Sequence, residues 1–197
     1  MKLYLDNNVV STLAKDDTPA ECEALLAILR AFEAKQCELC TSAITLQEQK
    51  RYKGPRNIEF VYRLLEKVPV VDYEEFLGGG FEEGDGCVEV WCDTEPHPTW
   101  ERLCVMGLDE VDAHHVLVAI EASCDVFLTC DGGILRLAEQ IETELRISIQ
   151  KPTAFAIGAL GWQPGQKAKE TDVVAVPLSV SPRPKRRFRT AREWRIK

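Results

Sequence analysis

Residues 126–133, VFLTCDGG, are a short apolar run that ends in an acid and two glycines. A run of this length is typical of a strand buried on both faces of a parallel sheet. Residues 2–6, KLYLD, repeat the pattern near the N-terminus. Ligand sites of open α/β sheets lie at the C-terminal ends of the parallel strands, so Asp6 and Asp131 are candidate site residues. Each acid also has a structural explanation, as the N-cap of a following helix.

Strands and helices alternate along much of the remaining chain. Further strands are predicted at 38–41, 70–71 and 146–150. One or two helical turns are predicted at 9–14, and helices at 19–35, 44–52, 58–68, 109–123 and 133–143. This alternation predicts an α/β fold in which helices cover both faces of a parallel sheet. The glycine-rich residues 76–98 break the alternation and are interpreted as an inserted loop or hairpin.

A third acid, Glu48, lies on the predicted helix 44–52. Its neighbours one turn away are Ile44 and Tyr52, so the carboxylate is part of a partly apolar stripe. The alternative is a surface Glu paired with Arg51, an interaction that contributes only a few tenths of a kcal/mol.

A fourth acid, Asp112, lies in the first turn of the predicted helix 109–123, whose faces are largely apolar. The structural alternative is that Asp109 caps the helix and that Asp112 is a favourable acid in its first turn. This alternative explains Asp109 better than it explains Asp112. His115 is one turn further on the same side. It is expected either to cap the buried face or to contact the acids.

If these four acids converge, their charges must be balanced. Two carboxylates 4 Å apart repel by roughly 4 kcal/mol at an effective dielectric constant of 20. A hard divalent cation with oxygen ligands removes this repulsion, and magnesium or manganese (Mg²⁺ or Mn²⁺) suits such a site.

Four short blocks follow one another in the chain: residues 3–10 (LYLDNNVV), 41–48 (TSAITLQE), 112–119 (DAHHVLVA) and 127–131 (FLTCD). In order and spacing they resemble the PIN-domain ribonucleases. In size the nearest members of that family are the VapC-like toxins of type II toxin–antitoxin pairs. The resemblance covers residues 1–160.

The resemblance implies a three-layer α/β/α sandwich with a central, mainly parallel sheet over residues 1–160, followed by a proline-containing basic tail over residues 161–197. The segment 76–107 is longer than this family leads us to expect. Asn8 matches the polar residue two positions after the first acid, and Thr129 the hydroxyl before the last. The implied catalytic and metal-ligating residues are Asp6, Glu48, Asp112 and Asp131.

The implied activity is that of a Mg²⁺- or Mn²⁺-dependent endoribonuclease that hydrolyses RNA to 5′-phosphate and 3′-hydroxyl ends. Three functions stay open: a toxin neutralised by an antitoxin, an RNA-processing nuclease that is not a toxin, and a catalytically silent PIN-like module that binds RNA or protein. The presence of all four acids counts against the third. Candidate partners are RNA, an antitoxin protein and a second copy of the chain.

Charge is distributed unevenly along the chain. The net charge is -8, but residues 183–197 hold eight basic residues and one acid, which leaves residues 1–182 at -15. An acidic body needs a cation or a partner to attract RNA. The tail interleaves aromatic residues with arginines, as single-stranded RNA-binding segments do, but it could equally dock on the acidic body. The candidate RNA-binding residues are Arg186, Arg187, Phe188, Arg189 and Trp194.

The eight cysteines raise the question of a zinc site. Close metal-ligand spacing is found at Cys37 and Cys40, but a zinc site usually needs a second such pair. We interpret the cysteines as buried or incidental thiols. No run approaches 18 apolar residues, and the N-terminus meets an acid at once, without a signal-peptide core. The sequence predicts a cytoplasmic protein with no membrane partner.

Overall fold

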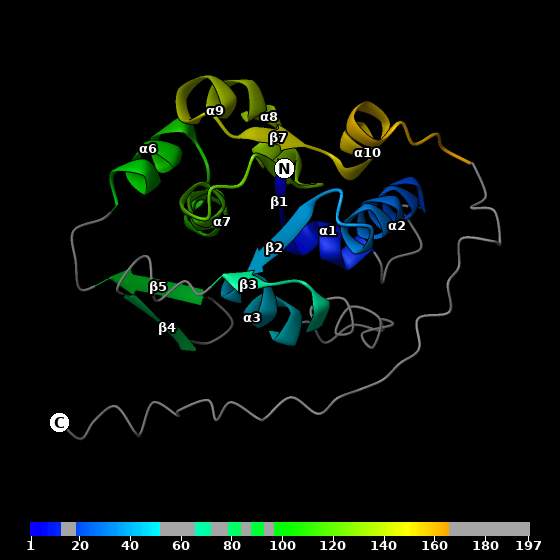
Figure 1. The fold of residues 1–197 in the computed structure, drawn as a ribbon. Coiled ribbons are helices and arrows are strands. Elements are labelled where there is room, and N and C mark those ends of the chain that lie inside the picture. The colour runs from blue at the N-terminus through cyan, green and yellow to red at the C-terminus, as the bar shows by residue number, and fades with distance from the viewer. Residues whose placement is uncertain (13–18, 52–65, 72–78, 84–87, 93–96, 166–197) are drawn as a thin grey trace. The chain divides into compact units, whose positions relative to one another are not determined.

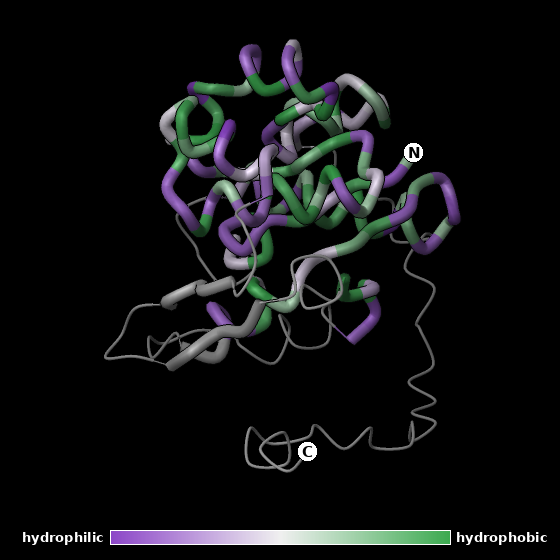
Figure 2. The backbone as a smooth tube through the Cα atoms, turned by 90° about the vertical axis from the view of Figure 1, so that its left-hand side faces the viewer, coloured by the Kyte–Doolittle hydropathy of each residue, from purple (hydrophilic) through white to green (hydrophobic). Residues whose placement is uncertain are grey.

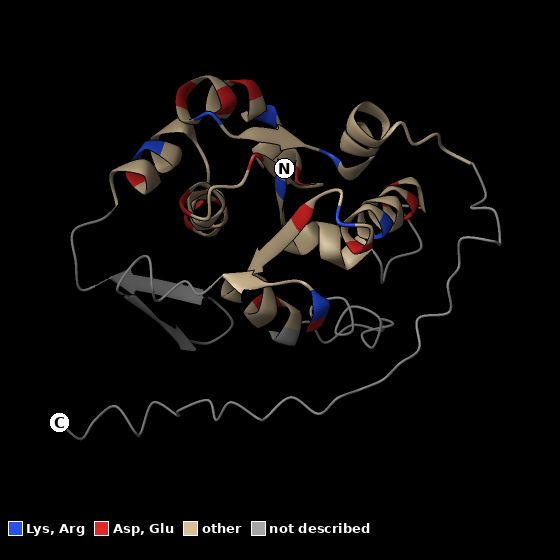
Figure 3. Cartoon of the chain, viewed as in Figure 1, with Lys and Arg blue, Asp and Glu red and all other residues tan. Residues whose placement is uncertain are grey.

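Five short parallel strands form the central sheet of the computed structural model (Figure 1). Their spatial order is β3 (Val70–Val71), β2 (Glu38–Ser42), β1 (Lys2–Leu5), β6 (Val126–Leu128) and β7 (Ser148–Gln150). The register pairs Leu3 of β1 with Leu39 of β2 on one side and with Val126 of β6 on the other. These strands carry charge only at their first residues, Lys2 and Glu38 (Figure 3). The predicted α/β fold class is confirmed.

The structure describes residues 1–12, 19–51, 66–71, 79–83, 88–92 and 97–165. The chain divides into a unit Met1–Pro164 and a unit Gly165–Lys197. The tail residues proposed to bind RNA lie outside the described residues, as does nearly all of the helix predicted over 58–68. In the described part of the chain, no helix is long and apolar enough to cross a membrane.

Two apolar clusters pack on opposite faces of the sheet, because side chains alternate along each strand. Tyr4 and Phe127 belong to one cluster, and Leu5 and Leu128 to the other. The first cluster includes residues of α6 (Pro98–Met106), α7 (Glu110–Glu121), α8 (Gly132–Arg136) and α9 (Ala138–Leu145). The second includes residues of α1 (Asn7–Thr12), α2 (Pro19–Glu33) and α10 (Pro152–Leu160). Figure 1 shows the two helical layers, and Figure 2 shows how hydrophobic and hydrophilic stretches alternate along the chain. With an apolar cluster on each face of the sheet, the predicted α/β/α sandwich is present.

Most helices occur where they were predicted. α2, α3 (Ala43–Arg51) and α7 correspond to the helices expected at 19–35, 44–52 and 109–123. The single helix predicted at 133–143 is wrong, because Leu137 separates α8 from α9. Two helices were not predicted, α6 and α10, and both begin with a proline in the first turn, where its missing N–H costs nothing.

The glycine-rich segment contains the predicted hairpin. β4 (Gly79–Glu83) and β5 (Val88–Cys92) pair antiparallel, with Gly79 opposite Cys92. The later part of the segment 76–107 is α6, whose Leu103 is fully buried in the core. This segment therefore combines a hairpin with a helix that belongs to the packed unit.

Candidate active site

The four predicted acids lie around one edge of the sheet. Asp6 directly follows β1, and Asp131 follows the adjacent parallel strand β6, so both are at C-terminal strand ends. Glu48 is carried by α3, which follows β2, and Asp112 by the first turn of α7. The charges of Asp6 and Asp131 both raise the pKa of Asp112, and the charge of Glu48 raises the pKa of Asp6. Electrostatic contacts therefore connect Glu48 with Asp6, Asp6 with Asp112, and Asp112 with Asp131.

Asp6 is the most buried of these acids, with 4% of its surface exposed. Burial raises the pKa of its carboxyl group, while His115 and the hydroxyl of Thr129 lower it in part. Thr129 Oγ1 donates to Asp6 Oδ2 at 2.7 Å, and the backbone N–H of Asn7 donates to Oδ1 at 2.6 Å. The carboxylate is therefore held in a fixed orientation at the end of β1.

The pKa of Asp112 is raised as well. Burial and the charges of Asp109, Asp6 and Asp131 raise its pKa to about 7. Asp109 is the N-cap of α7, as expected, since its Oδ1 accepts from Asp112 N at 2.8 Å. A carboxyl group that is half protonated near neutral pH is typical of sites where several carboxylates share too little positive charge.

Asp131 is a helix N-cap, as one of the two explanations of this acid predicted. Its Oδ1 accepts from the backbone N–H groups of Gly133 at 2.6 Å and Ile134 at 3.2 Å, which makes it the N-cap of α8. A cap at a strand end does not exclude a second role, because its charge still acts on Asp112. Asp131 therefore caps α8 and also belongs to the acid cluster, by which we mean Asp6, Glu48, Asp112 and Asp131.

Asn8 and Thr129, predicted as supporting residues, connect Asp6 with the start of α8. Thr129 Oγ1 accepts from Asp131 N at 2.9 Å while it donates to Asp6. Asn8 Nδ2 lies 3.2 Å from Thr129 Oγ1, and Asn8 Oδ1 accepts from Cys130 N at 2.8 Å. This network fixes the ends of β1 and β6 relative to each other.

Glu48 contacts a buried chain of polar side chains that the sequence did not reveal. His115 Nε2 lies 3.1 Å from Glu48 Oε2, so this histidine contacts the acids rather than only capping an apolar face. His115 Nδ1 lies 2.8 Å from the Tyr4 hydroxyl oxygen, which in turn lies 2.7 Å from Ser42 Oγ. The alternative pairing of Glu48 with Arg51 involves a side chain outside the described ones.

His115 gives the acid cluster a basic group. Burial lowers its pKa, but the hydrogen bond to Glu48 and the charges of Asp6, Glu48 and Asp112 outweigh burial, and the net shift is upward. Tyr4 and Ser42 could not be found from the sequence, since a tyrosine in a strand and a serine before a helix are ordinary core and capping residues. His115 had one signal, its i+3 spacing from Asp112.

The chemistry of this donor set fits a hard divalent cation. It consists of carboxylate oxygens, which Mg²⁺ and Mn²⁺ prefer, and their mutual repulsion is what a cation would relieve. Among the described residues, however, no three His, Cys, Asp or Glu side chains are arranged to hold one ion together. The carboxylates of Asp6, Glu48 and Asp131 are instead engaged with Thr129, His115 and backbone N–H groups. Binding of an ion therefore requires some of these side chains to turn.

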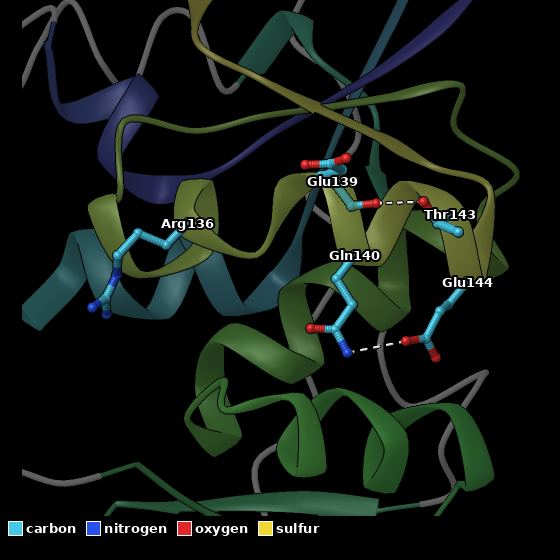
Figure 4. A pocket seen from close by; sticks show the side chains of 5 residues that line it. All are labelled: Arg136, Glu139, Gln140, Thr143 and Glu144. Carbon is cyan, nitrogen blue, oxygen red and sulfur yellow. Dashed lines mark hydrogen bonds between the residues drawn. The ribbon is translucent and has the colours of Figure 1, made fainter.

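The cysteines that were considered for zinc are in the core. Cys37 and Cys40 are buried, and Cys40 Sγ lies 3.3 Å from Cys124 Sγ across the first apolar cluster. A surface hollow of about 370 Å³ lies over α8 and α9, and none of the four acids lines it. Its residues are Arg136, Glu139, Gln140, Thr143 and Glu144 (Figure 4). Gln140 Nε2 donates to Glu144 Oε1 at 3.0 Å, so polar groups of this hollow are paired with one another.

No protein-family model matches the sequence, and no curated protein matches it either. Among solved structures, the chain is similar to one in the crystal structure of VapBC2 from Rickettsia felis bound to a DNA fragment from their promoter. The TM-score is 0.45 and the sequence identity 14%, and the match covers 77% of this chain and 98% of that chain.

Proposed function

We propose that the protein is a metal-dependent endoribonuclease that hydrolyses RNA phosphodiester bonds. One observation supports the proposal. Asp6 and Asp131 lie at the C-terminal ends of the adjacent parallel strands β1 and β6, the charges of both act on Asp112 of α7, and the charge of Glu48 of α3 acts on Asp6. Structural roles account for Asp109 and for part of Asp131, and His115 offsets part of the charge of Asp6 and Glu48. The pKa of Asp112 is nevertheless raised to about 7 by burial and by the charges of Asp109, Asp6 and Asp131, so negative charge in this region stays incompletely balanced.

In this proposal Asp6, Glu48 and Asp112 hold Mg²⁺ or Mn²⁺, and Asp131 orients the attacking water or contributes to a second ion. A bound cation would polarise the phosphodiester and favour deprotonation of water. Asp112 must lose its proton to become a ligand, which its pKa of about 7 permits at neutral pH. Thr129 and Asn8 keep Asp6 in place through the hydrogen bonds described above.

RNA as the substrate, and a toxin role with a partner antitoxin, are proposed from the resemblance of the four sequence blocks to the VapC-like PIN-domain ribonucleases. An RNA-processing nuclease that is not a toxin uses the same site and the same chemistry. A neighbouring gene for a small DNA-binding antitoxin would favour the toxin. Dimerisation of the chain remains part of the proposal, and its measurement is the mass of the purified protein in solution.

A second candidate, a catalytically silent module that binds RNA or protein, is favoured by one specific observation. The carboxylates of Asp6, Glu48 and Asp131 are hydrogen-bonded within the protein, and no three His, Cys, Asp or Glu side chains of the described residues form a ready coordination site. Against it stands the presence of all four acids. Turnover separates the two candidates.

The test is an RNA cleavage assay on total RNA with Mg²⁺ or Mn²⁺, reversal by EDTA, and mapping of the new ends. The proposal predicts cleavage that stops with EDTA, resumes with excess metal and leaves 5′-phosphate and 3′-hydroxyl ends. Asp6→Asn should abolish it, which also excludes a contaminating nuclease. RNA that is bound but not cut under all metal conditions would instead support the silent module.

A further inference from the structure

We propose that His115 is a positioning residue that holds the Glu48 carboxylate toward the acid cluster, and that Tyr4 and Ser42 fix its imidazole ring in turn. The inference rests on the proposed function, because a Glu48 that binds a metal ion needs its carboxylate held in a fixed orientation. It concerns a buried chain of four side chains that come from β1, the end of β2, α3 and α7.

The geometry restrains the imidazole at both nitrogens. The His115 side chain is 2% exposed, whereas that of Glu48 is 26% exposed. The ring meets Tyr4 edge-on with centroids 6.0 Å apart, and Tyr4 stacks on Phe127 at 5.1 Å. A glutamate at the protein surface samples many rotamers, and ordering it costs side-chain entropy. A rigid partner lowers that cost before any ligand arrives.

The proton positions follow from donor and acceptor capacity. An ionised Glu48 carboxylate only accepts, so His115 Nε2 must carry the proton between them. On the other side, Nδ1 either donates to the Tyr4 oxygen, with Tyr4 donating to Ser42, or accepts from Tyr4, with Ser42 donating to Tyr4. Both arrangements leave Nε2 as a donor aimed at Glu48, so the contact is satisfied in either protonation state of the ring.

The chain also connects Glu48 to the frame of the sheet. Tyr4 is fully buried two residues before Asp6, and Ser42 ends β2 directly before α3 begins. Ser42 Oγ also faces the first turn of α3, 3.5 Å from Thr45 N. Ser42 therefore contacts both the first turn of α3, which carries Glu48, and, through Tyr4, the His115 ring that contacts the Glu48 carboxylate. Partners that orient ligands in this way typically change affinity or activity 10- to 100-fold when removed.

The test compares His115→Leu, His115→Gln and the control His114→Leu. His114 is the next residue of α7 and is also buried, but its Nδ1 faces the backbone oxygen of Glu110 at 2.7 Å and its ring lies beside Trp100. We expect His115→Leu to lower kcat for RNA cleavage about 10- to 100-fold and to weaken Mn²⁺ binding by a similar factor, with KM for RNA nearly unchanged. His115→Gln keeps an N–H donor, so it should retain a large part of both kcat and Mn²⁺ affinity.

The proposal is overturned if His115→Leu is no more harmful than His114→Leu, or if glutamine is as harmful as leucine. A measurement without RNA or metal separates it from the proposed function. In ¹H–¹⁵N spectra of the wild-type protein, the His115 Nε2 proton should be protected from exchange, and Glu48→Ala and Tyr4→Phe should each remove that protection. A protected proton in a protein that cleaves no RNA would refute the nuclease and leave the contact standing. A His115 Nε2 without a proton, or one indifferent to Glu48→Ala, would refute the positioning role whatever the activity.

Discussion

Asp109 and Asp112 lie in the same turn of α7, yet their carboxylates meet different surroundings. Asp109 accepts the backbone N–H of Asp112 and so satisfies a helix end. Asp112 is half-buried and responds to the charges of Asp109, Asp6 and Asp131. At the scale of single residues, one acid stabilises the helix and the other belongs to the cluster.

This difference predicts unequal effects of the same substitution. Asp109→Asn keeps an oxygen that can cap the helix, so most nuclease activity should remain. Asp112→Asn removes a proposed metal ligand and should abolish nearly all activity. Initial rates of cleavage at saturating Mn²⁺ measure both. Equal losses, or a larger loss from Asp109→Asn, would show that the roles in this turn are assigned wrongly.

The raised pKa of Asp112 also predicts a pH dependence of stability in the metal-free protein. Its folded value is about 7 against 3.8 for the free group, so its contribution to stability is full below pH 3.8 and is lost as the pH rises to about 7. Asp112→Asn should therefore stabilise the metal-free protein at about pH 8, by about 1–2 kcal/mol after allowance for solvent screening. The gain should shrink toward about pH 5. Urea denaturation in EDTA measures it, and a pH-independent change would contradict the interpretation.

At the scale of elements, local pattern identified the strands and most helices. Apolar runs closed by an acid indicated β1 and β6, since parallel strands are buried on both faces. The break at Leu137 was missed because the apolar spacing of residues 133–143 continues through it. α6 and α10 were missed although each begins at a proline, since one follows a glycine-rich segment and the other precedes the tail.

Topology indicated from the sequence that Asp6 and Asp131 lie at the C-terminal ends of strands. The grouping of these acids with Glu48 and Asp112, and the supporting roles of Asn8 and Thr129, came from the resemblance to the PIN-domain ribonucleases. The chain from Ser42 through Tyr4 and His115 to Glu48 could not be predicted, because it depends on the register of β1 against β2 and on the rotation of α7 about its axis. Periodicity shows which helix face is buried, but it does not show which side chain on another element meets it.

Thr129 provides a test of the connection between β1 and β6. Its Oγ1 donates to Asp6 and accepts from Asp131 N, and the residue is fully buried. Thr129→Val keeps the shape and leaves both groups unpaired, which should lower the free energy of unfolding by about 1–3 kcal/mol. Thr143→Val is the matched control: its hydroxyl donates to the Glu139 carbonyl on an exposed helix turn, and its loss should cost less than about 0.5 kcal/mol. Equal values by urea denaturation would contradict the connecting role.

At the scale of the whole molecule, the acidic residues 1–182 and the basic residues 183–197 need separate explanations. An acidic surface repels RNA unless cations or a basic segment compensate. One proposal is that the tail supplies this compensation. The competing proposal is that the tail docks on the acidic body.

Deletion of residues 183–197 distinguishes these proposals. An RNA-binding tail predicts weaker RNA affinity and a flatter salt dependence, by about 0.7 for each of roughly two to five lost phosphate contacts, with little change in melting temperature. Phe188→Ala and Trp194→Ala should each cost about 1–3 kcal/mol of RNA affinity if the rings stack on bases. A tail docked on the body predicts a lower melting temperature and an unchanged salt slope.

The measurement that tests the central claim most directly is the melting temperature of the wild-type protein as a function of Mn²⁺ and Mg²⁺ concentration at neutral pH. If the carboxylates at the ends of β1 and β6, on α3 and on α7 hold a cation, the melting temperature should rise with metal, with about 2.7 kcal/mol of stabilisation at a hundredfold excess over Kd. Asp6→Asn and Asp112→Asn should remove this increment and stay folded, and Asp109→Asn should keep it. A wild-type melting temperature that ignores both metals up to millimolar concentrations would contradict the claim.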